Sequence, residues 1–243
     1  YVLYSGTPCQ IAGLNSFLRK GYDNLLTVDL ICHGVPSNLF FHEYLRWLEK
    51  KLKCTISEYR FRDKRRMGWG SYGSMQYEKL QKTKTFTRWL TANNDYYFHY
   101  FYLRGDNYRE SCYRCKYAKA SREGDFTLGD YWGIQKHHPE IAAKDGVSLV
   151  LVNTEKAKRL LADISKSLDL VPSKLEYAVE KNGNLVAPTA RPQTRDTIYK
   201  DLTQKGFERV SRENIKLKRF VPWIKRKIPI RIKNKIKMLL KRN

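Results

Sequence analysis

The placement of four cysteines is the feature that most restricts how this chain can fold. Cys9 and Cys32 each stand where an apolar, strand-like run ends and a helix is expected to begin, and Cys112 and Cys115 form a C-x-x-C pair about eighty residues further along. A fold that brings these three places together would create a four-thiolate metal site. The sequence therefore predicts that two strand ends meet a distant hairpin.

The spacing of these thiols leaves the identity of the metal open. A C-x-x-C pair serves zinc, iron-sulfur clusters and dithiol redox couples alike. A zinc site usually contains a second such pair, whereas Cys9 and Cys32 are single thiols with 22 residues between them. Dispersed, all-thiolate ligation favours an iron-sulfur cluster over zinc. The turn at Cys9 would equally suit a redox thiol, because a helix N-terminus lowers the pKa of a cysteine.

The remaining cysteine and the chain start indicate the cellular setting. Cys54 precedes a predicted strand, and we expect it to be a buried core residue. An odd cysteine count without dense, even spacing is typical of a reducing compartment. The sequence shows neither a run of eighteen apolar residues nor a signal-peptide pattern, so we expect a cytoplasmic protein. The chain begins with Tyr1 rather than Met, directly before a predicted strand, so we expect that an N-terminal piece is missing.

Alternating strands and helices predict an α/β (α+β) fold. The patterns predict strands over 2–5, 25–31 and 147–153, helices over 10–19, 37–52, 95–103 and 154–167, and antiparallel strands over 56–62, 71–77 and 83–89. Ser37 and Thr154 are the expected N-caps. The predicted architecture is a mixed sheet flanked by helices with an antiparallel insertion, plus a basic C-terminal helical tail.

The tail carries much of the charge. The chain has a net charge of +23, and residues 214–243 contain 12 Lys or Arg and no Asp or Glu. Apolar residues recur there at helical spacing between lysines, which predicts a basic amphipathic helix: Ile232, Ile236, Leu239 and Leu240. Such a helix suits an anionic membrane surface or an acidic partner, and a solvated terminal helix is the alternative. We therefore expect a domain over residues 1–213 and a separate tail over 214–243.

Two glycine-containing turns are candidate ligand contacts. His33 and Gly34 directly follow Cys32, and the segment 124–133 places three glycines around a short strand with Asp130 and Trp132 at its exit. Glycine allows backbone to approach a ligand closely, and an aromatic side chain can lie against a flat ring. The alternatives are a structural hydrogen bond for His33 and a tight turn with a core tryptophan for Trp132.

Six motifs in a fixed order resemble a known family. They are Gly-Thr-Pro-Cys-Gln-Ile-Ala-Gly-Leu, Val-Asp-Leu-Ile-Cys-His-Gly-Val-Pro-Ser, Phe-Arg-Asp-Lys with Gly-Trp, Cys-Tyr-Arg-Cys-Lys-Tyr-Ala, Gly-Asp-Phe-Thr-Leu-Gly-Asp-Tyr-Trp-Gly and Gly-Val-Ser-Leu-Val-Leu-Val-Asn-Thr. From residue 1 to about residue 210, the chain resembles the coenzyme F420 hydrogenase/dehydrogenase beta subunits, particularly their C-terminal domain. The resemblance implies an oxidoreductase in which a flavin accepts a hydride and passes electrons singly to an adjacent cluster. A ferredoxin-like domain often precedes this domain in the family, and the chain lacks it.

The resemblance also implies roles residue by residue. Cys9, Cys32, Cys112 and Cys115 each stand in a matching motif and are the implied ligands of a [4Fe-4S] cluster, whereas Cys54 matches none. The implied FAD contacts are Gly6, Thr7, Pro8, Gln10, Lys64, Gly68, Trp69, Gly129, Asp130, Tyr131 and Trp132.

Charged residues in these motifs are candidates for adjusting the cofactors. Lys64 would favour the anionic form of a reduced flavin, and Arg114 and Lys116 would offset the negative charge of a cluster. Lys64 and His33 are the candidate catalytic residues, although electron transfer of this kind requires no protein nucleophile.

The charge also indicates the class of partner. It suits an acidic electron carrier such as a ferredoxin or flavodoxin, the missing ferredoxin-like domain, a nucleotide-linked sugar, or anionic lipid at the inner face of a membrane through residues 214–243. Similar bacterial proteins occur with polysaccharide-assembly genes, which makes a non-catalytic accessory subunit an alternative. A zinc-stabilised nucleic-acid-binding module is the other alternative. Nucleic acid is disfavoured because much of the charge lies in the tail and no reader motif occurs.

Overall fold

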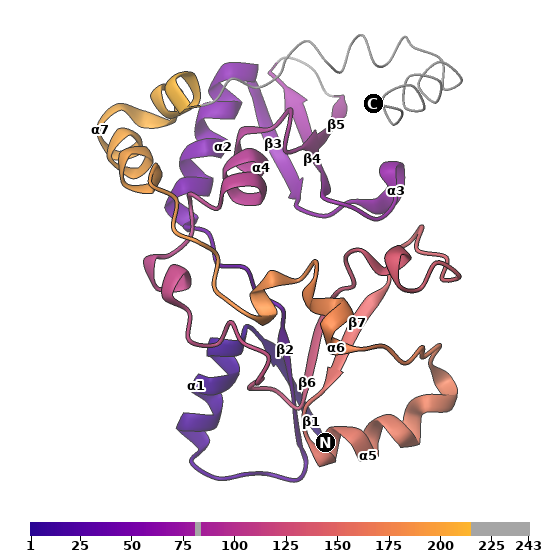
Figure 1. Cartoon of the computed structure of the whole chain (residues 1–243). Helices are drawn as coiled ribbons and strands as arrows, with labels where there is room; N and C mark the ends of the chain where they lie inside the picture. The colour runs from indigo at the N-terminus through magenta and orange to yellow at the C-terminus, as the bar shows by residue number, and fades with distance from the viewer. Residues whose placement is uncertain (81–83, 215–243) are drawn as a thin grey trace, which may run out of the picture.

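The computed structural model describes residues 1–80 and 84–214 and has a mixed α/β architecture with two sheets (Figure 1). The larger sheet has the strand order β1-β2-β6-β7, with β1 at Val2–Gly6, β2 at Leu25–Leu30, β6 at Phe126–Asp130 and β7 at Ser148–Val152. Strands β1, β2 and β6 run parallel, and β7 runs antiparallel to β6. The predicted mixed sheet is therefore confirmed.

The helix α1 (Pro8–Leu18) connects β1 to β2. It begins two residues earlier than predicted because Pro8 occupies the first helical position, where a missing N–H costs nothing. Thr7 and Gln10 form a capping box around this start, in which the Thr7 backbone N–H donates to the Gln10 side chain (2.9 Å). Because β1 and β2 are parallel, the residues that follow them, including Cys9 and Cys32, leave the sheet at the same edge.

The second sheet is an antiparallel meander inserted between β2 and β6. Its strands are β3 (Cys54–Arg60), β4 (Tyr72–Lys79) and β5 (Thr85–Thr91), in that order. Strand β5 begins two residues later than predicted. The helix α2 (Asn38–Leu52) is capped by Ser37, whose hydroxyl accepts from the Phe40 amide (3.4 Å), as predicted. The main core lies against this sheet: Phe40, Tyr44, Leu48, Met75, Leu90, Tyr97, Phe98, Tyr100, Ile198, Leu202, Phe207 and Val210.

The aromatic segment after β5 differs from the single α-helix predicted for it. It forms a short helix α4 (Tyr96–Phe98) followed by a π-helix η1 (His99–Arg104), which ends at Gly105 with φ 64°. Asp95 caps the start by accepting from the Phe98 amide (3.1 Å). Tyr97, Phe98 and Tyr100 are all almost fully buried. The sequence pattern predicted a helical segment here, but it does not distinguish an α-turn from the wider π-turn.

The remaining elements are short except for α5 and α7. They are α3 (Lys64–Met67), η2 (Glu110–Arg114), η3 (Ile134–Lys136), α5 (Glu155–Ile164), η4 (Ser165–Ser167), α6 (Leu175–Val179), η5 (Gly183–Leu185) and α7 (Arg195–Asn214). Thr154 caps α5 by accepting from the Ala157 amide (3.2 Å), as predicted. The sequence patterns did not predict α7, which is kinked at Gly206.

Some expectations fall on residues that the structure does not describe. The basic amphipathic helix expected at Ile232, Ile236, Leu239 and Leu240 lies outside the described residues, as does Thr83. Within residues 1–80 and 84–214, we find no helix with the length and apolar character needed to cross a membrane.

Candidate functional site

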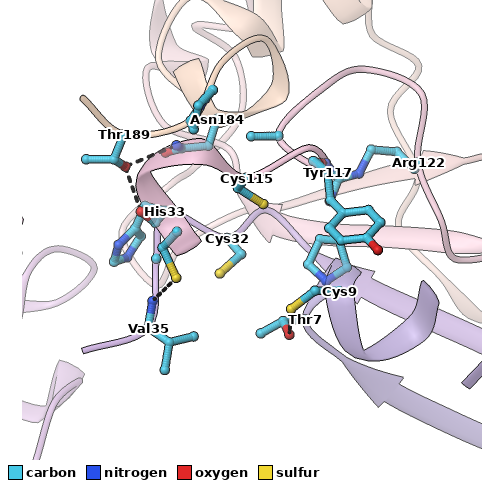
Figure 2. Close-up of a pocket in the computed structure, with 15 residues that line it drawn as sticks. Thr7, Cys9, Cys32, His33, Val35, Cys115, Tyr117, Arg122, Asn184 and Thr189 are labelled. Carbon is cyan, nitrogen blue, oxygen red and sulfur yellow. Dashed lines mark hydrogen bonds between the residues drawn. The ribbon is translucent and has the colours of Figure 1, made fainter. Parts of the chain in front are cut away.

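The four predicted cysteine ligands line one cavity. Cys9 comes from α1, Cys32 from the loop after β2, and Cys112 and Cys115 from η2 and the residue that follows it. Figure 2 shows Cys9, Cys32 and Cys115 around this space, with a dashed line marking the bond from the Val35 amide to Cys112. The cavity, called the thiol cavity below, has a volume of about 410 Å³, including the part that opens to solvent. The predicted meeting of the three segments is therefore observed.

Each segment holds its thiol by local contacts. The Cys112 Sγ accepts from the backbone N–H of Val35 at 3.4 Å, which links η2 to the loop that carries Cys32. The Cys9 Sγ lies 3.1 Å from the Thr7 hydroxyl. All four thiols are free; Cys9 is exposed, whereas Cys32, Cys112 and Cys115 are half-buried. The cavity is thus open on the side of Cys9.

The thiols are close enough to influence one another electrostatically. Burial raises the pKa of the Cys32 thiol above its ordinary value, and the neighbouring thiols Cys112, Cys9 and Cys115 raise this pKa further. A hydrogen bond from the backbone of Gly34 opposes this effect. Bringing several thiolates together without a compensating cation is unfavourable, which is the situation that a bound metal relieves.

The chemistry of the donor set suits an iron-sulfur cluster. All four candidate ligands are thiols, and soft thiolate ligands are those that iron-sulfur clusters use. Three of the four are half-buried. Within the described part of the chain, no group of three or more His, Cys, Asp or Glu side chains is arranged to hold a single metal ion.

A second cavity adjoins the thiol cavity. It has a volume of about 1030 Å³, including open solvent, and its lining shares His33 and Asn184 with the thiol cavity. It is lined by Leu30, Ile31, His33, Arg62, Ser71, Leu128, Gly129, Asp130, Trp132, Lys181, Asn182, Gly183 and Asn184. Leu30 and Leu128 pair in register on adjacent strands and are partly exposed. They give this cavity an apolar surface at the same end of the sheet as the thiols.

Trp132 belongs to a layered cluster at the edge of the second cavity. Its ring stacks on Trp69 with centroids 4.7 Å apart and an interplanar angle of 3°. The Trp69 indole N–H donates to Asp130 Oδ1 (3.0 Å), and Arg62 pairs with Asp130 Oδ2 (2.9 Å). The Arg62 guanidinium also lies 5.5 Å from the centre of the Trp132 ring. Asp130 therefore holds both the Trp69 indole and the Arg62 guanidinium in place beside Trp132.

His33 lies between the two cavities and is held by aromatic residues. The Tyr108 hydroxyl donates to the Phe101 carbonyl (3.0 Å), so the His33 Nδ1 at 2.7 Å must donate to the Tyr108 oxygen. Burial lowers the pKa of His33, which favours the neutral ring, and the bond to Tyr108 then places its proton on Nδ1. The structural hydrogen bond expected as the alternative for His33 is thus present.

The predicted flavin contacts divide between the two cavities. Gly129, Asp130 and Trp132 line the second cavity, with Trp69 stacked behind Trp132. Thr7 and Pro8 line the thiol cavity instead. Five further predicted residues are absent from both linings among the described residues: Gly6, Gln10, Lys64, Gly68 and Tyr131.

The local roles of several predicted residues are also clear. The Lys64 Nζ donates to the Asp145 carbonyl (2.7 Å), and Gly68 ends α3 with φ 72°. The Tyr131 hydroxyl lies 2.6 Å from the Ser173 hydroxyl, and its ring is buried. Arg114 and Lys116 are exposed on either side of Cys115. Cys54 is buried at the start of β3, as predicted for a core residue.

Some residues that close the site lie outside the six motifs, and the sequence patterns did not identify them. Arg122 lines the thiol cavity, and the segment 181–189 borders both cavities through Asn184. Thr189 donates to the His33 carbonyl (2.6 Å) and accepts from Asn184 (3.2 Å). These positions carry no local motif, because their role depends on contacts with residues far away in the sequence.

Comparison with known proteins gives one match. A family model for the C-terminal part of the coenzyme F420 hydrogenase/dehydrogenase beta subunit matches residues 1–176. No curated protein and no solved structure matches the chain. The matched range contains all four cysteines of the thiol cavity and the Trp69–Trp132 stack.

Proposed function

The chain belongs to the coenzyme F420 hydrogenase/dehydrogenase beta-subunit family, and from this premise we propose that it transfers electrons between a flavin in the second cavity and a [4Fe-4S] cluster in the thiol cavity. Family membership itself suggests an oxidoreductase-related role. The observation that most supports the finer proposal is the shared wall: His33 and Asn184 border both cavities. Two redox groups on the two sides of this wall would be neighbours.

The proposed cluster ligands are Cys9, Cys32, Cys112 and Cys115. With both groups bound, a flavin supplies two-electron chemistry and a cluster one-electron chemistry, so the pair would connect carriers of the two kinds. The Val35 amide that donates to Cys112 would stabilise negative charge on that sulfur, as hydrogen bonds to cluster sulfurs do.

The proposed flavin-binding residues are those around Trp132. Leu30 and Leu128 would contact the apolar part of the ring system, and Gly129 would leave room for close approach of the backbone. The Arg62 and Lys181 cations that line this cavity would attract an anionic cofactor group. Lys64 lies outside the cavity lining, and its effect on the flavin stays a prediction that Lys64→Met would test.

The proposed partner is an acidic one-electron carrier. Cys9 is the exposed member of the thiol set, and Arg114, Lys116 and Lys119 are exposed around the C-x-x-C pair. An acidic protein would be attracted to this side, which brings it close to the proposed cluster.

The test is purification without oxygen, followed by absorption and EPR spectroscopy with iron, sulfide and flavin analysis. We expect flavin bands and a cluster that can be reduced. Replacing any one of the four cysteines by serine should remove or alter the cluster signal, whereas Cys54→Ser should leave it unchanged. A colourless protein with bound zinc would contradict the proposal. Flavin and cluster without electron transfer to any carrier would favour a non-catalytic accessory role.

A further inference from the structure

One buried arginine connects two of the cysteine-bearing loops. The side chain of Arg122 is only 1% exposed and forms an ion pair with Asp29, which is fully buried (2.9 Å). Asp29 lies in β2, three residues before Cys32, and Arg122 follows the C-x-x-C pair in the sequence. Arg122 also lines the thiol cavity, where Figure 2 shows it beside Tyr117.

All the guanidinium N–H groups of Arg122 have partners. Nη2 donates to Asp29 Oδ1 and to the Leu30 carbonyl, both at 2.9 Å. Nη1 donates to the carbonyls of Tyr117 (3.2 Å) and Lys119 (3.1 Å). Nε lies within bonding distance of Asp29 Oδ1 (3.3 Å) and of the Thr127 hydroxyl (3.2 Å). No donor is left for a ligand, so Arg122 acts through the segments that it joins.

These segments are the two that carry Cys32 and Cys115. Leu30 is two residues before Cys32, and Tyr117 is two residues after Cys115. The same carboxylate of Asp29 accepts from the amides of Glu123 (3.1 Å) and Gly124 (3.0 Å), which fixes the turn that holds Arg122. A fully satisfied, buried guanidinium of this kind holds a defined geometry.

On the basis of the proposed function, we propose that Arg122 is a positioning residue for the cluster: it fixes the spacing of Cys32 and Cys115, and its buried positive charge favours the reduced form. We call this arrangement of Arg122 and Asp29 the Arg122 clamp. Because Arg122 offsets the buried carboxylate of Asp29, removing it leaves negative charge near the cluster uncompensated, which disfavours the added electron and lowers the midpoint potential. Groups that orient metal ligands in this way typically change metal affinity by about 10-fold to 100-fold when removed.

The first experiment compares cluster properties in the full chain, purified without oxygen. The variants are Arg122→Met, which removes the charge, Arg122→Lys, which keeps the charge but not the fork of donors, and Lys156→Met as a matched control. Lys156 pairs with Asp125 (3.0 Å) and binds the carbonyl of Leu25 at the opposite end of β2. The control therefore removes another ion pair to a buried carboxylate without touching the cysteine loops.

We expect Arg122→Met to lose its cluster to a chelator about tenfold faster than wild type and to have a more negative midpoint potential. Arg122→Lys should restore the potential toward the wild-type value but not the rate of loss, because one ammonium cannot reach all the carbonyls. Lys156→Met should keep both properties. Wild-type cluster retention and potential in Arg122→Met would overturn the proposal.

A second experiment works without the cluster. In a chain with Cys9, Cys54 and Cys112 replaced by serine, dibromobimane would cross-link the two remaining thiols, Cys32 and Cys115. We expect cross-linking to be slower when Arg122→Met is added, and equal rates would overturn the positioning role. If the wild-type chain takes up no cluster, the proposed function fails, whereas slower cross-linking in Arg122→Met would still support the Arg122 clamp.

Discussion

The ring of Tyr108 fills the space next to the α-carbon of Gly34. A β-carbon at residue 34 would lie 2.3 Å from Cδ2 of that ring, and Gly34 has φ 136°, which other residues rarely adopt. The same tyrosine receives the hydrogen bond from His33. The turn that carries Cys32 and His33 is therefore shaped by an aromatic side chain from the segment just before the C-x-x-C pair.

Gly34→Ala should disturb the thiol cavity. We expect it to lower the free energy of unfolding by about 2 kcal/mol or more, because it combines overpacking with an unfavourable φ. It should also reduce cluster content, since the Cys32 loop must move. Urea unfolding and iron analysis would measure the two effects.

The matched control is Gly13→Ala in α1, where no atom lies within 4 Å of the added carbon apart from the adjoining residues and the backbone of the helix itself. We expect this variant to be unchanged or more stable by up to about 1 kcal/mol, because alanine favours the helix. Equal stability of the Gly34 and Gly13 variants would contradict the close packing described for Tyr108.

Trp132→Ala should weaken flavin binding. The ring forms part of the second cavity and stacks on Trp69, so its removal takes away both a cavity wall and the stacking partner of Trp69. We expect the dissociation constant for FAD to rise at least about tenfold, as is typical when an aromatic stacking surface is lost. Quenching of flavin fluorescence would measure it. Trp89→Ala is the control, because Trp89 lies on β5 next to Arg65 and Arg66 and outside both cavity linings. Equal FAD affinity in the two variants would argue against a flavin beside Trp132.

Reversing the charge around the C-x-x-C pair should slow electron transfer to an acidic carrier. In the triple variant Arg114→Glu, Lys116→Glu and Lys119→Glu, we expect the second-order rate of ferredoxin reduction to fall about tenfold or more at low salt. The difference should shrink as salt is added, because salt screens exposed charges. Stopped-flow absorption would follow the reaction.

The control for this surface reverses three exposed cations elsewhere: Lys158, Arg159 and Lys166, on α5 and η4. Both triple variants have the same net charge, so a general charge effect would slow both equally. That result would place the docking surface somewhere other than beside Cys9.

The ionisation of Asp63 should make the free energy of unfolding decrease at acid pH. Its carboxylate is buried and accepts from the Arg65 guanidinium, from the Arg65 amide (3.1 Å) and from the Ser74 hydroxyl (2.6 Å). The Arg65 side-chain bond, despite the opposing effect of burial, holds the pKa of Asp63 well below its ordinary value. Because the pKa in the folded state is below that in the unfolded chain, the ionised group stabilises the fold above about pH 4 and loses this contribution as the pH falls further.

We therefore expect Asp63→Asn to lower the free energy of unfolding by about 2 kcal/mol at pH 7. The difference from wild type should become smaller below about pH 4. Urea unfolding at several pH values would measure it, with exposed Asp163→Asn as the control. If the difference in the free energy of unfolding between wild type and Asp63→Asn does not change with pH, the charge of Asp63 does not contribute to stability.

The sequence predicted the parts of the site that follow from local patterns. Apolar runs ending in Gly-Thr-Pro and in Cys-His-Gly located the ends of β1 and β2, and the parallel pairing of these strands placed Cys9 and Cys32 at one edge. The C-x-x-C spacing identified the other two thiols. Ser37 and Thr154 were recognisable as caps because capping depends on residues three positions apart.

The rest depends on contacts that no local pattern encodes. Arg122 was missed because its partners in β2 lie more than ninety residues away, at Asp29 and Leu30. The resemblance implied flavin contacts for Gly6, Thr7, Pro8 and Gln10, and that role stays a prediction. No local pattern showed that Thr7 and Pro8 line the thiol cavity, or that the Gln10 side chain closes a capping box. The π-turns of η1 replaced an expected α-helix because tertiary packing of the aromatic rings determines the local backbone.

The four thiols come from segments that are far apart in the sequence, so the site can form only late in the synthesis of the chain. The cavity needs α1, the loop after β2 and η2, and its clamp also needs β6, so residues from 9 to beyond 122 must have left the ribosome before the site can exist. Domains generally fold as units once enough chain is available. A nascent chain that ends within the β3–β5 meander would therefore hold two of the thiols without their partners, and we expect the proposed cluster to bind stably only after β6 has joined the larger sheet.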